Sequence, residues 1–304
     1  IEQDIRRFQS RFPSGSKYMS DAYRARSKIF RPKTRAMVRK NEAVAAEAFF
    51  STLDMVSITP SDESDMVQSV SAEVMQQLLQ YRLTKSIPWF LTCIGAYQDA
   101  QVTGVVVSHQ YWEYNPKKKI DRPKIEILPV ENIRFDPAAA WYDPINTSPY
   151  VIRLMPMYVK DVKARMQSGR WIDMEDAKIL SAIRNYDTTR MERDGNRTDA
   201  TRDVTSVTDY TIVWVHQNVV EWDGEDYLFY TLGTELLLSD PVPLTSEYAH
   251  CVSGARPFVL GCCVIETHKV YPVGASNLGA QVQDEINEVT NQRLDNVKFV
   301  LNKR

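Results

Sequence analysis

The chain is 304 residues long, with 43% hydrophobic and 25% charged residues, the balance of a globular protein that can bury a sizeable core. Its longest mostly apolar runs, 87–97 and 257–265, are far shorter than the roughly 20 residues that cross a bilayer. No membrane association is therefore expected. Four cysteines are too few for a disulfide framework in a chain of this length, and they indicate reduced thiols in a protein assembled in a cytoplasm.

The net charge of −2 hides an uneven distribution of charge along the chain. Residues 1–40 hold twelve of the 37 Lys and Arg but only three of the 39 Asp and Glu, so the remainder carries 25 basic and 36 acidic groups. Tight non-specific DNA binding depends on neutralising phosphates with basic groups. The acidic body therefore disfavours a protein that grips DNA over its whole surface.

Residues 1–35 predict a basic N-terminal arm that lies outside the folded core, because the segment contains Pro13 and Pro32 and has little apolar periodicity. The simplest interpretation is a solvated charged surface. The alternative is a docking segment that contacts DNA or an acidic partner. The candidate contact residues are Arg24, Arg26, Lys28, Lys33 and Arg35.

Residues 36–270 predict a mixed domain of the α+β class. Helical periodicity covers 36–53, a helix from about 61 to 81 with one apolar face, and a third helix from about 88 to 100. The apolar face of the second helix consists of Val67, Val70, Val74, Leu78 and Tyr81. Near residue 102 the period changes to the alternation of strands, which we expect at 105–114, 124–130 and 150–157.

The second half of this domain predicts two short helices and an antiparallel meander. Residues 187–206 have almost nothing to bury and predict a mobile surface loop. Strands are expected at 209–216, 219–222, 227–232 and 235–238, with Asp223-Gly224 as a hairpin turn. A buried strand is expected at 257–267.

The residues from 271 onward predict about thirty residues of one continuous helix, with Ser276 as its N-cap. Apolar side chains recur along it at three- and four-residue steps, and the rest of its circumference carries amides and charges. A narrow apolar seam of this kind suits a contact between like neighbours better than the core of a monomer. The predicted intersubunit residues are Val282, Ile286, Val289, Val297 and Val300. The helix has no stop signal, and we expect more protein to follow Arg304.

The chain contains no recognisable phosphate-binding loop, dinucleotide fingerprint, zinc-protease motif or nucleophile elbow. One cluster merits comparison with metal sites: His250, Cys251, Cys262, Cys263 and His268. Adjacent cysteines on a strand point to opposite faces, so buried thiols are the favoured interpretation. Asp136 and Asp143 resemble a carboxylate pair, but each precedes a proline and predicts a turn. We expect no catalytic, metal or cofactor site.

Three stretches, in their order along the chain, resemble the portal proteins of tailed double-stranded DNA bacteriophages, nearest the short-tailed type. The first is I-G-A-Y-Q-D-A at 94–100 with the following strand at 105–107, and the second is V-E-N-I-R-F-D-P at 130–137. The third combines H-K-V-Y-P-V-G-A-S at 268–276, Q-D-E-I-N at 283–287 and N-Q-R-L-D-N at 291–296.

The resemblance implies that 36–270 is a wing domain, that 271–304 begins a stem helix, and that a clip, a second stem helix and a crown follow. It implies a virion structural protein without enzyme activity, forming a ring, most often of twelve subunits, at one capsid vertex. The implied partners are the major capsid protein, the terminase that drives DNA packaging, a tail adaptor and double-stranded DNA, with assembly in the bacterial cytoplasm. The alternatives are a nucleic-acid-processing enzyme whose arm delivers DNA to Asp136 and Asp143, and another ring-forming head–tail component.

Overall fold

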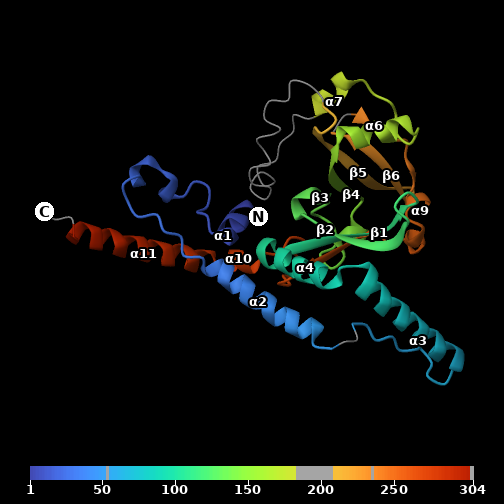
Figure 1. The fold of residues 1–304 in the computed structure, drawn as a ribbon, viewed down its shortest axis with the longest axis horizontal. Helices are drawn as coiled ribbons and strands as arrows, with labels where there is room; N and C mark the ends of the chain where they lie inside the picture. The colour runs from blue at the N-terminus through green and yellow to red at the C-terminus, as the bar shows by residue number, and fades with distance from the viewer. Residues whose placement is uncertain (53–54, 183–207, 234–235, 302–304) are drawn as a thin grey trace.

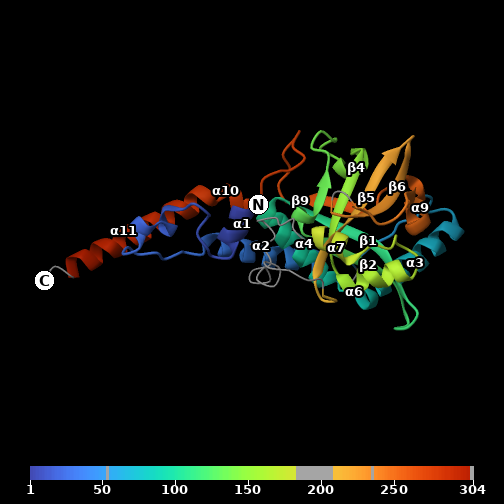
Figure 2. The same cartoon turned by 90° about the horizontal axis from the view of Figure 1, so that it is seen from above.

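A computed structural model describes residues 1–52, 55–182, 208–233 and 236–301. The protein is a mixed α+β fold with antiparallel sheets, as the periodicity predicts. Figures 1 and 2 show the sheets gathered at one end, and a long helix, α11 (Ala280–Leu301), extending away from them at the other. The predicted mobile loop at 187–206 lies outside the described residues.

The first sheet has three strands in the order β2-β1-β9, formed by β1 (Val105–Asn115), β2 (Ile120–Leu128) and β9 (Phe258–Cys262). It follows directly on α4 (Trp89–Thr103), so the predicted change from helix to strand near residue 102 is confirmed. The buried strand expected at 257–267 is shorter than predicted. Within the part of the chain that the structure describes it pairs with β1 alone, and Val259 on it is half exposed.

The second sheet runs in the order β3-β4-β5-β6-β7, with β8 also paired to β6. Its strands are β3 (Ile133–Phe135), β4 (Tyr150–Tyr158), β5 (Ile212–Trp222), β6 (Glu225–Leu232), β7 (Leu236–Leu237) and β8 (Val242–Pro243). The two strands expected at 209–216 and 219–222 form one strand, β5. The turn at Asp223-Gly224 is confirmed, with positive φ of 52° and 82°, the backbone that a two-residue hairpin requires.

The main core joins both sheets to the short helices α5 (Pro144–Thr147), α6 (Val159–Gln167), α7 (Asp176–Ala182) and α9 (Leu244–Glu247). Val107 and Phe258 contribute from the first sheet, and Val151, Val215 and Leu228 contribute from the second. One contiguous cluster across both sheets makes them a single folding unit, without a linker between them.

A second, smaller core attaches the start of the chain to this unit. It consists of Ile5 in α1 (Glu2–Phe8), Val38 in α2 (Lys33–Phe50) and Val102 in α4, with Phe8 and Met37 packed against them. The expectation that the whole of 1–35 lies outside the core is therefore wrong for the first eight residues. Their three apolar residues, Ile1, Ile5 and Phe8, are too few to stand out as a helical period.

The helix α3 (Met66–Tyr81) projects from the sheets (Figure 1), and its predicted apolar face is not a core face. Val67, Val70, Val74, Leu78 and Tyr81 are 52–74% exposed. The opposite side of α3 holds the segment before it, because Gln80, Gln76 and Gln68 accept hydrogen bonds from the N–H groups of Met55, Ile58 and Asp62.

The junction before α11 is built on close backbone contact. A Cβ on Gly274 would lie 2.8 Å from the carbonyl oxygens of Gln101 and Val102, and a Cβ on Gly104 would lie 2.1 Å from that of Pro272. Gly104 also has a φ of +94°, which favours glycine. Two glycines therefore allow the end of α4 to seat against the chain that enters the terminal helices.

Two predictions for this terminal segment are wrong. The helix is not continuous, because Gly279 separates α10 (Ala275–Leu278) from α11. Ser276 is not the N-cap, since Gly274 occupies that position. Ser276 is instead fully buried inside α10, and its hydroxyl donates to the carbonyl of Asp4. This contact adds to the attachment of α1.

Candidate functional site

The helix α11 holds the N-terminal arm along one of its sides by a row of polar side chains. Gln283, Asn287, Asn291 and Asp295 are spaced four residues apart, and we call them the polar ladder. Spacing by four keeps side chains on one side of a helix. Gln283, Asn287 and Asn291 are at most 2% exposed, although they lie on a helix that leaves the body of the molecule.

The partners of the ladder are backbone groups at alternate residues of an extended part of the arm. The N–H groups of Ser27, Ile29 and Arg31 donate to Asp295, Asn291 and Asn287, each at 2.8 Å. Those of Lys33 and Thr34 donate to Gln283 at 3.0 Å. In return, the amide nitrogens of Asn291 and Gln283 donate to the carbonyls of Ile29 and Arg31.

The two spacings match in length. Two residues of extended chain advance about 6.6 Å, and four residues of helix advance about 6.0 Å. The arm and the helix can therefore run antiparallel with one contact at every step. This arrangement supplies hydrogen-bond partners to backbone groups of a segment that pairs with none of the described strands.

Side chains on the rest of the arm strengthen the attachment. Lys17 pairs with Glu288 at 2.6 Å, which raises the pKa of Lys17 and lowers the pKa of Glu288. Hydrogen bonds from Ser27 lower the pKa of Asp295. Four aromatic rings, Phe12, Tyr18, Tyr23 and Phe30, pack together in the arm, with ring centroids 4.4–5.7 Å apart.

The basic candidates predicted from the sequence lie on the outside of this attached arm. Arg24, Arg26, Lys28, Lys33 and Arg35 are all exposed, as is Arg31. Arg26 lies over the ring of Tyr23, and Arg35 lies over that of Phe8. Within the described residues, no carboxylate forms an ion pair with Arg24, Lys28, Arg31 or Lys33. We call these six exposed residues of positions 24–35 the basic row.

The predicted intersubunit residues lie on the other side of α11. Val282, Val289, Val297 and Val300 are 49–70% exposed, and Ile286 is partly buried. With 3.6 residues per turn, this apolar seam points roughly opposite to the polar ladder. The arm of the same chain therefore covers the ladder and leaves the seam open. Phe299 and Leu301 extend the exposed apolar surface toward the end of the helix.

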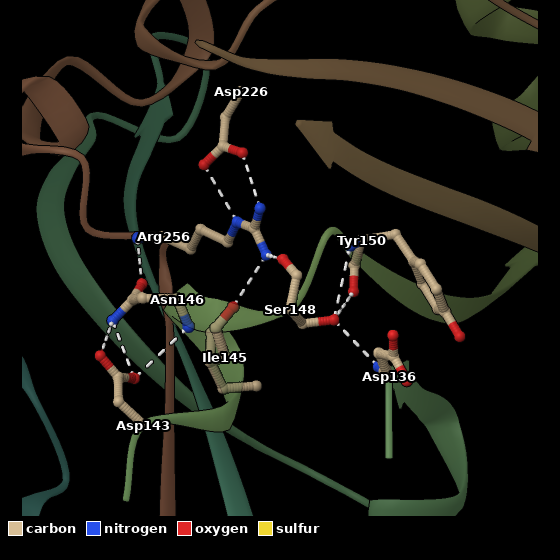
Figure 3. Close-up of polar contacts among 8 residues, drawn as sticks. All are labelled: Asp136, Asp143, Ile145, Asn146, Ser148, Tyr150, Asp226 and Arg256. Atoms are coloured by element: carbon tan, nitrogen blue, oxygen red, sulfur yellow. Dashed lines mark hydrogen bonds and ion pairs between the residues drawn. The ribbon is translucent and has the colours of Figure 1, made fainter. Parts of the chain in front are cut away.

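Asp136 and Asp143 both support local turns, as their position before proline predicts. Asp136 accepts from the N–H of Ala138 at 2.8 Å, and Asp143 caps α5 by accepting from Asn146. Beside them, Arg256 makes the most connected polar cluster of the region (Figure 3). Its guanidinium forms a bidentate pair with Asp226 and donates to the carbonyls of Ile145 and Ser148. These contacts tie three separate segments together.

A second buried polar cluster lies between the sheets around His109. Arg153 donates to Nδ1 of His109 at 3.0 Å, so the proton of the neutral ring lies on Nε2, 3.1 Å from the hydroxyl of Tyr248. Burial, followed by the charge of Arg153, lowers the pKa of His109 to about 3. This ring stays neutral near neutral pH.

The cysteines and histidines weighed as metal ligands do not converge. Cys251 is buried, where burial raises its pKa to about 11, whereas Cys262 is exposed. Among the described residues, no group of three or more His, Cys, Asp or Glu is placed to hold a metal ion. Within those same residues, no helix is both long and apolar enough to cross a membrane.

Comparison with known proteins adds no family assignment: no protein-family model matches the chain, and no curated protein matches it significantly. Reasoning from the sequence missed the polar ladder. The signal for it was the recurrence of Gln283, Asn287, Asn291 and Asp295 at four-residue steps.

Proposed function

We propose that this chain is the subunit of a ring, the portal of a tailed double-stranded DNA bacteriophage, with the sheets as its wing and α11 as the start of its stem. The observation that carries the proposal is the seam of α11, which is exposed in one chain although the helix already has a partner on its other side. The sequence resemblance at 94–100, 130–137 and 268–296 supplies the family.

The energetics of the seam support assembly. Burying a fully exposed Val or Ile stabilises by about 1.5–3 kcal/mol, so a half-exposed side chain gains about half of that. Several such residues on each subunit, repeated around a closed ring, give an association that no single contact provides. A head-to-tail contact between two different surfaces closes into a ring when the rotation between neighbours permits it.

In this proposal the ring is a passage for DNA during packaging and ejection. Its partners are the capsid protein, the terminase and the tail adaptor. The acidic balance of residues 41–304 supports a conduit along which DNA slides, because a uniformly basic surface would hold phosphates. Asp136 and Asp143 are both engaged in turns, so nothing in their geometry favours the alternative of an enzyme.

The test is the assembly state of the Val289→Asp variant, measured by sedimentation velocity and electron microscopy. Val289 is 58% exposed, so the single chain should fold normally, as circular dichroism would show. At a contact between copies the new carboxylate would be buried without a partner, at a cost of several kcal/mol. We expect rings from the parent and monomers from the variant.

The matched control is Gln281→Asp, which adds the same charge to the same helix at an exposed position beside the seam's edge. Asp in the first turn of a helix is also favourable. This control should still form rings. Assembly of Val289→Asp at the parent level would remove the main support for the proposal, as would a parent chain that stays monomeric.

A further inference from the structure

We infer that the seam of α11 in one subunit packs on the N-terminal arm of the next subunit, so that the arm, and not a bare helix, is the receiving surface. The inference rests on the proposed ring. It adds a partner surface that the seam alone does not identify.

The positions of the seam and the polar ladder around α11 determine which surface a neighbouring seam would meet. The seam and the polar ladder lie on roughly opposite sides of α11. In a ring, each helix has one neighbour on either side, related by the same rotation, so the surface opposite the seam is the one that meets the next seam. On α11 that opposite surface is covered by residues 27–34 of the arm, through the ladder.

The outer surface of the arm has the chemistry to receive an apolar seam. Ile29 is held to Asn291 by its backbone, while its side chain is 46% exposed. Its neighbours in the sequence include the exposed Lys28, Arg31, Pro32 and Lys33. The arm thus covers the buried amides of the polar ladder, and its own outer surface combines apolar and basic groups.

Charged residues beside the seam and on the arm also favour this contact. Glu285 lies beside the seam on α11 and is exposed, and within the described residues it has no ion-pair partner. Arg31 and Lys33 on the arm likewise lack one. A contact between seam and arm would therefore bring an unpaired acid of one chain to unpaired basic groups of the next, which favours this pairing over a contact between two seams.

The residues of the arm and of the seam also match in their positions along the helix axis. Rotation about a ring axis keeps each residue at its own height, and for a helix along that axis the ladder gives the height of each arm residue. Ile29 lies level with Asn291, close to Val289, and Arg31 and Lys33 lie level with Asn287 and Gln283, on either side of Glu285. Apolar and charged groups therefore coincide with complementary groups in one register.

Cysteine cross-linking tests the contact. Ile29→Cys and Val289→Cys are prepared as separate variants in a Cys262→Ser background, because Cys262 is the exposed native cysteine. The two are mixed during assembly and treated with a short bismaleimide. We expect covalent dimers from the mixture and few from either variant alone. The matched control mixes Ile29→Cys with Val300→Cys, which lies about 16.5 Å further along the helix than Val289, and should give few dimers.

Charge exchange gives a second readout. Arg31→Glu and Glu285→Arg should each reduce the fraction of chains in rings, and the double variant should restore it toward the parent level. Rings that form while the Ile29–Val289 mixture gives no more dimers than its control would overturn the inference and leave the ring intact. Absence of rings from the parent would overturn the proposed function and the inference together.

Discussion

Replacing Asn291 by Ala should detach the arm from α11 without unfolding the sheets. Asn291 is 2% exposed, accepts from the N–H of Ile29 at 2.8 Å and donates to its carbonyl at 2.9 Å. Each hydrogen bond of this kind contributes about 0.5–1.5 kcal/mol net, so the two together contribute about 1–3 kcal/mol. Because the arm is held by many small contacts in sequence, the loss should appear first as local opening.

Amide hydrogen exchange measures this opening at individual residues. A loss of 1–3 kcal/mol corresponds to a roughly 5- to 150-fold faster exchange, and we expect it at Ile29 and at the neighbouring Arg31. Amides of β5 should exchange at the parent rate. Asn296→Ala is the control, since Asn296 lies on the same helix and its side chain is exposed. Unchanged exchange at Ile29 in Asn291→Ala would refute the ladder as the attachment of the arm.

Three further predictions concern the core. Gly274→Ala should lower the free energy of unfolding measured in urea, because the added Cβ would lie 2.8 Å from carbonyl oxygens. Gly95→Ala, in open space within α4, should instead raise it by up to about 1 kcal/mol. Equal effects of the two substitutions would contradict this prediction. His109 has a folded pKa of about 3, below its unfolded value of about 6.5, so the unfolded state takes up the proton first. Stability should fall by up to about 1.4 kcal/mol per pH unit below 6.5, and a His109→Gln variant with an equally steep decline would exclude this source. Arg256→Lys should lower the melting temperature sharply, by loss of the bidentate pair with Asp226; a shift within error would show that the pair contributes little.

Local chemistry made much of the fold predictable. The helix-to-strand change near residue 102 and the Asp223-Gly224 turn follow from patterns that a few neighbouring residues determine. The burial of Ser276 was missed because it depends on contacts of α10 with α1 and α4, which are distant in sequence. The sequence around an apolar seam or a serine is the same whether its side chains are exposed to water or buried against protein.

The candidate site divides in the same way. The seam was predictable as a pattern, since apolar residues at helical spacing are visible in any sequence. The ladder was not, because Asn291 finds its partner 262 residues earlier in the chain. In the sequence, an amide residue on a helix looks the same whether its side chain is solvated or buried against a distant segment. The mistaken prediction for residues 1–8 has a similar origin, since the seven residues of α1 give too little periodicity to identify.

The spacing of the ladder also restricts how the length of the chain can change. Inserting one residue between Ser27 and Ile29 would turn the N–H groups of Ile29 and Arg31 away from α11, because successive N–H groups of an extended chain point in opposite directions. Two inserted residues would restore the direction but would require four more in the helix to supply another ladder position. Insertions and deletions in the two segments are therefore coupled in a ratio of two to four, although the segments lie some 250 positions apart in the sequence.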